Sequence, residues 1–374
     1  MLRKEGEPTA DVQMTIPDAV ADAKPDPEPT GKPTVSYSGH VQTYGDRAEV
    51  KDGATLGTTG EGKRLEALKV TVSGGSITYR AHVQGTGWQE WRKDGAEAGT
   101  HAQAKRMEAV QMQLDDTLSK DYSVWYRVHS QTFGWLGWAC DGEPAGTTGL
   151  AKRVEAIEIV VLPKGETPKK EYDAKKASYV GGTTCDAHVQ TTGWTGNQMG
   201  LSFGTTGKAK RLEAIKLTLA GEPYGGGIEY DVHCQTTGWQ ATKADGELAG
   251  TTGKAKRLEA VRVRLTGDEA KRHLSVWYRV HSQTFGWLGW ASDGDPAGTT
   301  GLAKRAEAIE VQVPSQGCRS VWLRRQRRRL QDQVAQSPII VSEDGPPPNC
   351  AVHSWVGVFC GVADPPRPWG TLPP

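Results

Sequence analysis

The sequence predicts an all-β protein made of two tandem blocks, each built from three short-stranded repeats. Gly occurs 46 times among the 374 residues and hydrophobic residues make up 36%, a composition that favours short strands and turns over helices. One motif recurs six times, and residues 125–159 recur almost unchanged from Trp277. A three-repeat unit has therefore been duplicated once.

The repeats share an ordered set of short motifs. Each opens with His-x-Gln, and a Gly five residues after the His is followed by Trp in every copy except the first, which has Asp46. An Asp-Gly pair and a Gly-Thr-Thr-Gly segment follow in most copies, and Arg-x-Glu-Ala closes all six. The opening pairs are His40 and Gln42, His82 and Gln84, His129 and Gln131, His188 and Gln190, His233 and Gln235, and His281 and Gln283.

Composition shifts divide the chain. Residues 35–163 form the first predicted domain, called the first block below, and residues 178–314 form the second block. Between them, residues 164–177 are rich in Lys, Glu and Pro without apolar periodicity, which predicts a linker. Residues 1–34 are rich in Pro and acidic residues and predict a disordered spacer.

The end of the chain, residues 315–374, differs from the rest. Lys is absent after Lys304, while Arg, Pro, Trp and Cys accumulate. One interpretation is a disordered basic tail. The interpretation we favour is translation out of frame, because a composition rich in Arg, Pro, Trp and Cys is typical of a shifted reading frame in GC-rich DNA. Resequencing the gene distinguishes the two interpretations.

Alternation predicts the strands within a repeat. From Ile77 to Val83 apolar and polar residues alternate, so His82 and Gln84 share the polar face. Gly-Trp begins a short middle strand, and Asp-Gly and Gly-Thr-Thr-Gly predict turns. A repeat of about three strands cannot bury both faces alone, so three repeats are expected to share a core. We predict pseudo-threefold blocks, β-prism-like or β-trefoil-like, with an open linear array of repeats as the alternative.

The last strand of each repeat carries charges where apolar residues are expected. Strict alternation places Arg153 and Glu155 on the same side as Ile157. An unpaired buried charge costs several kcal/mol, so we predict that Arg-x-Glu forms a structural ion pair in each repeat. A carboxylate held in the same pair six times is poor material for glycosidase catalysis.

The recurring V-x-G/T-x-G-W, D-G, A-G-T-T-G and R-L-E-A-I segments resemble the clostridial hydrophobic repeats with a characteristic Trp, known as ChW repeats. Residues 82–114 and 233–265 fit well, and the resemblance extends over residues 35–314. It implies a secreted or surface-displayed protein of a Gram-positive bacterium that interacts with the cell's surroundings. It implies neither an established ligand nor catalytic residues, and we expect no enzyme activity.

Trp residues are the first candidates for ligand binding. An exposed indole offers a flat apolar face on which a sugar ring can stack, and repeated copies add avidity, whereas the alternative is that these residues anchor the core. A second Trp, at Trp91, Trp138 and Trp290, occurs in half of the repeats, so the fold does not need it and we expect it to be exposed. The residues directly after the Gly are Trp88, Trp135, Trp194, Trp239 and Trp287.

The six His-x-Gln pairs are the second candidates. Both side chains can hydrogen-bond the hydroxyl groups of a ligand, and the alternative is that they fix the register between strands. Nothing in the sequence shows that the His residues converge, so we expect no metal site and no cofactor. A disulfide between Cys185 and Cys234, which sit on apolar positions of equivalent strands, is left open.

Charge and hydropathy exclude other classes of partner. Lys and Arg total 45 against 44 for Asp and Glu, and a net charge of +1 draws the chain neither to nucleic acid nor to an acidic membrane. No stretch approaches the roughly 18 apolar residues of a membrane span, so we expect no membrane insertion. The start lacks the apolar segment of a signal peptide, which we interpret as the sign of a fragment of a longer exported protein. We expect a monomer.

The sequence thus favours a non-catalytic, extracellular or cell-surface protein that adheres to carbohydrate, cell wall or host glycoprotein through repeated Trp-bearing loops. The alternative is a structural spacer, or a protein-protein assembly module, that presents another domain.

Overall fold

The computed structural model describes residues 31–173 and 176–317. The predicted spacer up to residue 30 and the predicted tail from residue 318 lie outside the described residues. In the described part, strands are joined by turns, and the helical segments are η1 (Leu118–Lys120) and α1 (Asp268–His273). The predicted all-β class is confirmed. Neither of these helical segments is long and apolar enough to cross a membrane.

The first and last strands of each repeat form a long antiparallel pair. Alternate apolar side chains of both strands face inward, as the sequence pattern predicts. The pairs are β1 (Val35–Val41) with β4 (Leu65–Val72), β5 (Ile77–Val83) with β9 (Met107–Leu114), β10 (Tyr122–Ser130) with β14 (Val154–Pro163), β15 (Tyr179–Val189) with β19 (Leu212–Ala220), β20 (Ile228–Cys234) with β24 (Leu258–Leu265), and β25 (Trp277–Ser282) with β29 (Ala306–Pro314).

A β-bulge in each long pair corrects the strict alternation expected for the last strand. In the third repeat His129 pairs with Ala156 and Ser130 pairs with Val154, so Glu155 is the extra residue. The bulge reverses the side on which the chain points, because one strand now has one more residue than its partner. Val154 is fully buried, whereas the Glu155 carboxylate lies beside His129 on the opposite face. The prediction that Glu155 shares the side of the core residues was therefore wrong.

The middle of the repeat contains more strands than the predicted total of about three per repeat implies. The Asp-Gly pairs have positive φ at both residues, for example 39° at Asp94 and 82° at Gly95, which is the geometry of a type I′ hairpin turn. The Asp94 carboxylate also accepts a hydrogen bond of 2.8 Å from the backbone N–H of Ile77. In the first repeat the middle contains one strand of seven residues, β2 (Gly45–Lys51). In the other repeats it contains strands of two or three residues: β6 (Gly87–Trp88), β7 (Arg92–Lys93), β11 (Gly134–Trp135), β12 (Ala139–Cys140), β16 (Gly193–Trp194), β17 (Gln198–Gly200), β21 (Gly238–Trp239), β22 (Lys243–Ala244), β26 (Gly286–Trp287) and β27 (Ala291–Ser292).

One further short strand per repeat pairs with a neighbouring repeat. In the first block β8 pairs with β4, β13 with β9, and β3 of the first repeat with β14 of the third. In the second block β23 pairs with β19, β28 with β24, and β18 of the fourth repeat with β29 of the sixth. Within each block the pairing between repeats therefore returns to its starting repeat. These strands are β3 (Leu56–Gly57), β8 (Ala98–Gly99), β13 (Ala145–Thr148), β18 (Ser202–Gly204), β23 (Ala249–Gly250) and β28 (Ala297–Gly298).

This contact explains why each of these short strands contains a Gly. Gly57 has φ of 106°, and a Cβ added there would overlap with the backbone carbonyl oxygen of Glu155 in the third repeat. The next residue, Thr58, donates its backbone N–H to the same carbonyl at 3.0 Å. Only Gly permits so close an approach of two backbones.

A conserved position within the repeats adds a second link between neighbours. Tyr79, three residues before His82, is fully buried and donates its hydroxyl to the carbonyl of Ala96. The same hydroxyl accepts the backbone N–H of Val70, in the preceding repeat, at 3.0 Å. The fourth repeat has Cys185 at this position instead of Tyr.

Each block has its own hydrophobic core. One cluster of buried side chains extends from Val35 to Val161 and another from Tyr179 to Val313. Cys185 and Cys234 both belong to the second core and are free thiols, so the disulfide left open by the sequence is not formed. Burial raises the pKa of the Cys185 thiol to about 12, which keeps it protonated.

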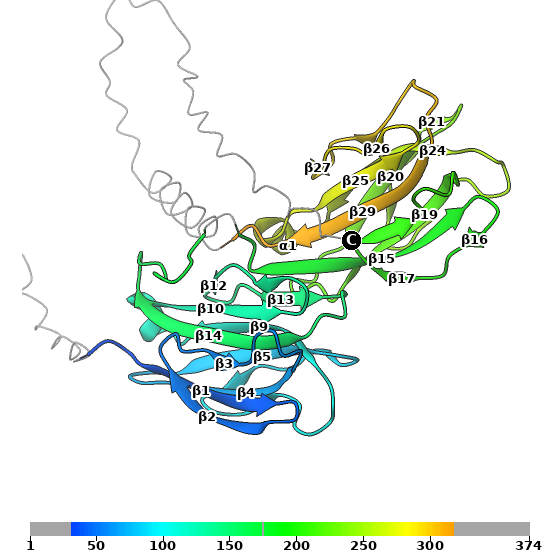
Figure 1. Cartoon of the computed structure of the whole chain (residues 1–374). Coiled ribbons are helices and arrows are strands. Elements are labelled where there is room, and N and C mark those ends of the chain that lie inside the picture. The colour runs from blue at the N-terminus through cyan, green and yellow to red at the C-terminus, as the bar shows by residue number, and fades with distance from the viewer. Residues whose placement is uncertain (1–30, 174–175, 318–374) are drawn as a thin grey trace, which may run out of the picture. The chain divides into compact units, whose positions relative to one another are not determined.

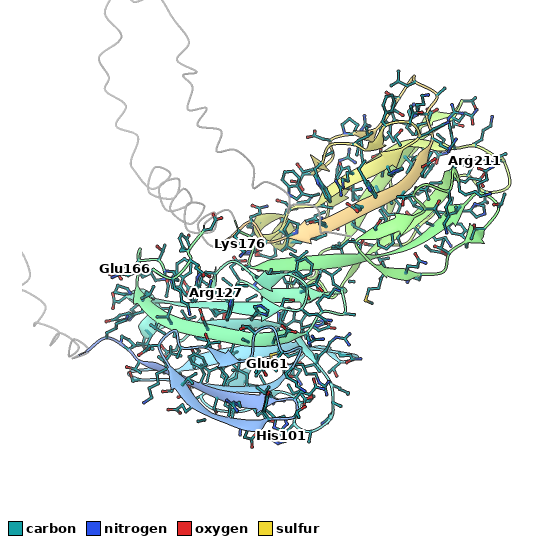
Figure 2. All side chains as sticks on the ribbon, viewed as in Figure 1. Glu61, His101, Arg127, Glu166, Lys176 and Arg211 are labelled. Carbon is teal, nitrogen blue, oxygen red and sulfur yellow. The ribbon has the colours of Figure 1, made fainter. Side chains whose placement is uncertain are left out.

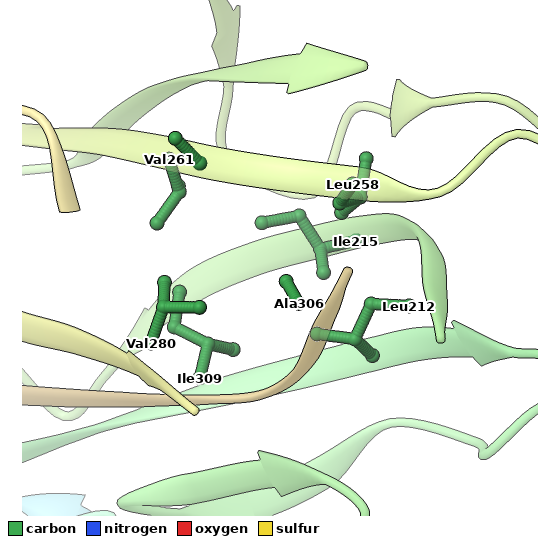
Figure 3. A pocket seen from close by; sticks show the side chains of 8 residues that line it. Leu212, Ile215, Leu258, Val261, Val280, Ala306 and Ile309 are labelled. Atoms are coloured by element: carbon green, nitrogen blue, oxygen red, sulfur yellow. The ribbon is translucent and has the colours of Figure 1, made fainter. Parts of the chain in front are cut away.

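Equivalent residues of three repeats meet at the centre of the second core. Figure 3 shows them around a cavity of about 10 Å³, roughly the size of one water molecule and too small for a ligand. The labelled side chains are Leu212, Ile215, Leu258, Val261, Val280, Ala306 and Ile309.

Strand β15 connects the sheets of the two blocks. Its first residues pair in parallel with β13 and antiparallel with β29, so one sheet includes strands of both blocks (Figure 1). Between β14 and β15 lies the predicted linker, in which Lys170 and Glu171 contact the third repeat.

Candidate binding sites around the repeated Trp

The His, Trp and Glu of each repeat after the first come together on the polar face of the long strand pair. The imidazole meets the indole edge-on, with ring centroids 5.2–5.5 Å apart and interplanar angles of 76–84°. The cross-strand pairing of the His with the Trp of the short Gly-Trp strand fixes this geometry. We call the group a Trp cluster. In the second repeat it consists of Trp88, His82, Glu108, Arg106 and Arg80.

The Glu of each cluster has both carboxylate oxygens engaged. Its Oε1 lies 2.6–2.9 Å from the Arg of the Arg-x-Glu motif. The first repeat, which lacks the Trp, has the same pair, with Arg64 and Glu66 2.5 Å apart, and the predicted ion pair is confirmed in all six repeats. In the five Trp clusters the Glu Oε2 lies 3.0–3.2 Å from the His Nδ1, although the angle is too bent for a well-formed hydrogen bond. Only 6–7% of this Glu side chain is exposed in the five clusters. This Glu therefore holds the His in place and is not a free acid.

A cation packs against every clustered indole, which the sequence analysis missed. The cation lies 3.8–4.9 Å from the ring centroid, within the range of a cation–π interaction. In the second, third and sixth repeats it is an Arg on the first strand: Arg80, Arg127 and Arg279. In the fourth and fifth it comes from the last strand: Lys216 and Arg262.

The two positions that supply the cation lie directly opposite each other, one on the first strand of the repeat and one on the last. Arg279 lies directly opposite Glu310 on the last strand, and its Nε contacts the Glu carboxylate at 2.6 Å. In the fifth repeat the charges are exchanged, with Asp231 on the first strand opposite Arg262 on the last. Comparing the repeats at the positions two before the His and three after the Glu would have revealed this exchange from sequence.

The second Trp accompanies the Arg of the first strand. Trp91, Trp138 and Trp290 occur in the three repeats with this Arg, and each guanidinium lies 4.6–5.0 Å from two indole centroids. In these repeats the Arg is therefore sandwiched between two Trp rings. The second Trp and the Arg form one structural unit.

The six repeats match the model of a known protein family. The model described as "Clostridial hydrophobic W" matches residues 40–74, 82–116, 129–163, 188–221, 233–267 and 281–314, more than half of the chain. The chain belongs to the ChW family. Each matched ChW segment begins at the His of a repeat, so the Arg two residues before it lies outside the matched ChW segment. No curated protein and no solved structure matches the chain.

The first Trp of the ChW repeats does not anchor the core. None of Trp88, Trp135, Trp194, Trp239 and Trp287 belongs to the core clusters among the described residues, where Tyr and aliphatic side chains pack instead. Trp194 is 36% exposed and the other four are partly exposed. The core-anchor interpretation of these residues was therefore wrong.

The second Trp of the ChW repeats has three different environments. Trp91 is 38% exposed and Trp290 is partly exposed. Trp138 is only 4% exposed, and its indole N–H donates to the carbonyl of Lys170 at 2.9 Å. The expectation of exposure was wrong for Trp138 because part of the predicted linker covers it.

The backbone at the His-x-Gln pair of the ChW repeats takes part in the pairing of the first and last strands. The backbone N–H of the Gln donates to the carbonyl of the Arg in the Arg-x-Glu motif at 2.9–3.0 Å in all six repeats. The clustered His side chains are 9–18% exposed and contact the Glu and the Trp of their own repeat. These contacts agree with the register interpretation, and ligand binding by the pair stays a prediction.

Proposed function

We propose that this ChW protein is a non-catalytic binding module that acts outside the cell and binds polysaccharide, cell wall or surface glycoprotein through its Trp clusters. One observation carries the proposal: five clusters hold a partly exposed indole in nearly the same geometry against a His edge and a cation. An indole braced in this way loses little conformational entropy on binding.

The chemistry of the cluster suits a sugar ligand. The indole provides apolar surface for the C–H groups of a sugar ring. The neighbouring guanidinium or ammonium supplies N–H donors for hydroxyl or carboxylate groups of the same ligand. One cluster of this size binds weakly, and several clusters on one chain bind an extended polymer with useful avidity.

We also propose that each block is a pseudo-threefold unit, β-prism-like or β-trefoil-like. The support comes from the pairing between repeats, which returns to its starting repeat in each block, and from the equivalent residues that line the central cavity. In such a unit the clusters are distributed around the block, which favours an extended or multivalent ligand over a single small molecule.

The test is co-sedimentation of the full chain with insoluble polysaccharides and purified cell walls, with Trp fluorescence read on the bound fraction. We expect saturable binding with a shift in emission. A Trp91→Ala, Trp194→Ala, Trp290→Ala variant should bind at least about tenfold more weakly, because the affinity of linked sites multiplies. The matched control replaces Met199 and Leu302, which are 61% and 57% exposed but outside the Trp clusters, with Ala.

Two internal contacts of Trp favour the alternative of a structural spacer or assembly module. The indole N–H of Trp88 donates to the carbonyl of Gly221 at 3.0 Å, and that of Trp138 donates to Lys170, so both indoles serve the protein itself. If the triple Trp variant binds as well as the parent chain, or if the parent binds nothing, the spacer function replaces the binding function.

A further inference from the structure

Two departures from the repeat pattern lie far apart in the sequence but close together in the structure. The first is Asp46, which stands where the other five repeats have the cluster Trp. The second is His101, which stands in the turn of the second repeat where the other five have the second Thr of Gly-Thr-Thr-Gly. The pairing of β8 with β4 brings this turn beside His40 of the first repeat.

The three side chains converge on one point. The Asp46 Oδ1 lies 3.0 Å from the Nδ1 of His40 and 3.8 Å from the Nδ1 of His101. The two imidazole rings are 4.3 Å apart, and one donor atom from each of the three residues lies within 4.8 Å of the others. Figure 2 labels His101, which projects at the periphery of the first block.

The His40 ring is oriented differently from the other five. In the Trp clusters the Nδ1 of the His faces the Glu, whereas the Nδ1 of His40 faces Asp46 and its Nε2 faces the carboxylate of Glu66 at 3.7 Å. Histidines that bind metals usually direct the second ring nitrogen to a carboxylate or carbonyl, which fixes the tautomer. Glu66 places a carboxylate near this nitrogen, at a distance longer than a direct hydrogen bond, and the same carboxylate pairs with Arg64 at 2.5 Å.

A third carboxylate, that of Glu97, lies beside the group and also contacts Lys69 at 3.5 Å. The Oε2 of Glu97 is 3.5 Å from the Nδ1 of His101. The side chains of Asp46 and His101 are 75% and 44% exposed, so an ion reaches the group from solvent and water completes its coordination. Two imidazoles and one carboxylate form a ligand set typical of Zn²⁺ and related divalent ions of the first transition row.

We propose that His40, Asp46 and His101 form a binding site for a divalent transition-metal ion such as Zn²⁺. The ion ties the first repeat to the turn of the second at the one place where the Trp cluster is missing. The first repeat has thus exchanged an indole site for a metal site.

The test is calorimetric titration of the full chain, without a His tag, with Zn²⁺, and titration with Co²⁺ as a spectroscopic probe of His ligation. We expect one saturable site in the parent chain. The variants Asp46→Trp and His101→Thr each restore the residue that the other five repeats carry, so the repeat fold tolerates them. Each should weaken Zn²⁺ binding at least about tenfold and remove the visible Co²⁺ absorption of that site.

The matched control is His233→Gln, which removes the equivalent of His40 from a repeat with a complete Trp cluster and should leave Zn²⁺ affinity unchanged. Circular dichroism of each variant verifies that it is folded. The proposal is overturned if the parent chain shows no saturable Zn²⁺ binding, or if both restored variants bind Zn²⁺ as tightly as the parent.

Discussion

The third and sixth repeats have nearly the same sequence but bury their clusters to different extents. The side chain of Arg127 is 2% exposed, whereas that of its counterpart, Arg279, is 17% exposed. Trp138 is buried, and its counterpart Trp290 is only partly buried. The residues of the two clusters are the same, so the sequence of the repeat alone does not determine how much of its cluster is exposed to solvent.

Residues of the predicted linker cover the Trp cluster of the third repeat. The carbonyl of Lys170 accepts the indole N–H of Trp138. The carboxylate of Glu171 contacts the guanidinium of Arg127 at 2.9 Å, and the ring of Tyr172 packs edge-on against Trp125 at 5.7 Å. One copy of the Trp-Arg-Trp sandwich is therefore part of the folded interior, and the other is accessible. The following predictions test that difference by changing the two copies in parallel.

The largest difference is expected for the carboxylate that pairs with the sandwiched Arg. Glu158→Ala removes the buried partner of Arg127, whose side chain is 2% exposed, and leaves this Arg an ion pair with the 70% exposed Glu171. The change should cost about 3 kcal/mol of unfolding free energy. Glu310→Ala removes the partner of Arg279 near the surface and should cost about 1 kcal/mol or less. Urea denaturation of both variants measures the difference, and equal losses would show that the two sandwiches are equally closed.

The second Trp should show the next largest difference. Trp138→Ala leaves a cavity under the linker and frees the carbonyl of Lys170, which should cost about 3 kcal/mol. Trp290→Ala removes a partly solvated ring and should cost about 1 kcal/mol. The same denaturation experiment compares them. A loss at Trp290 as large as that at Trp138 would contradict the distinction between a closed and an open copy.

Sequence patterns predicted the repeats, the long first and last strands of each repeat and the ion pairs, because each of these features recurs with a regular spacing in the sequence. The Arg-x-Glu pair recurs six times, and two opposite charges close together on a largely buried strand have few other solutions than to pair with each other. The side on which that pair lies was not predictable from alternation, because the bulge at residues such as Glu155 shifts the register by one residue. Recurrence revealed which residues matter, and only the backbone geometry showed where they point.

The candidate sites were predicted less well because they depend on contacts between segments that are distant in sequence. The burial of Trp138 depends on Lys170, in a segment without any periodic pattern. The approach of His101 to Asp46 depends on pairing between two repeats, and each residue alone reads as a degenerate copy of the motif. Departures from a repeat carry a signal, but only structure shows which departures coincide.

The acid dependence of stability should also separate the two repeats. Burial alone would raise the pKa of Glu158, but hydrogen bonds from Lys170, Thr55 and Arg127 outweigh burial and hold this pKa below its ordinary value. A lowered pKa in the folded state stabilises the fold above the unfolded pKa of about 4.3, and this contribution is lost as the pH falls through the folded pKa. The stability gap between the parent chain and Glu158→Gln should therefore shrink as the pH decreases below about 4.3.

Urea denaturation across that pH range measures this gap, and Glu310→Gln is the matched variant in the sixth repeat. A gap that stays constant from neutral to acidic pH would show that Glu158 contributes through its shape and not through its charge.

The smallest effect on the free energy of unfolding is expected from a change in the linker segment that covers the third repeat. Lys170 is the linker residue whose ammonium lies 2.5 Å from the Glu158 carboxylate, and its side chain is 56% exposed. Lys170→Ala should therefore cost only about 0.5–1 kcal/mol of unfolding free energy, because Arg127 and Thr55 still bind the carboxylate and solvent already screens the ammonium.

The same change should make Trp138 more accessible. The backbone carbonyl of residue 170 still accepts the indole N–H of Trp138, but the linker segment loses one of the contacts that bind it to the third repeat. Acrylamide should consequently quench the fluorescence of Trp138 more strongly in Lys170→Ala than in the parent chain. A Trp138→Phe variant with the same Lys170→Ala change gives the quenching of the other Trp residues, which is subtracted. Quenching that is identical with and without Lys170 would mean that Glu171 and Tyr172 keep the cover closed without it, and the closed state of the third repeat would then rest on those two contacts.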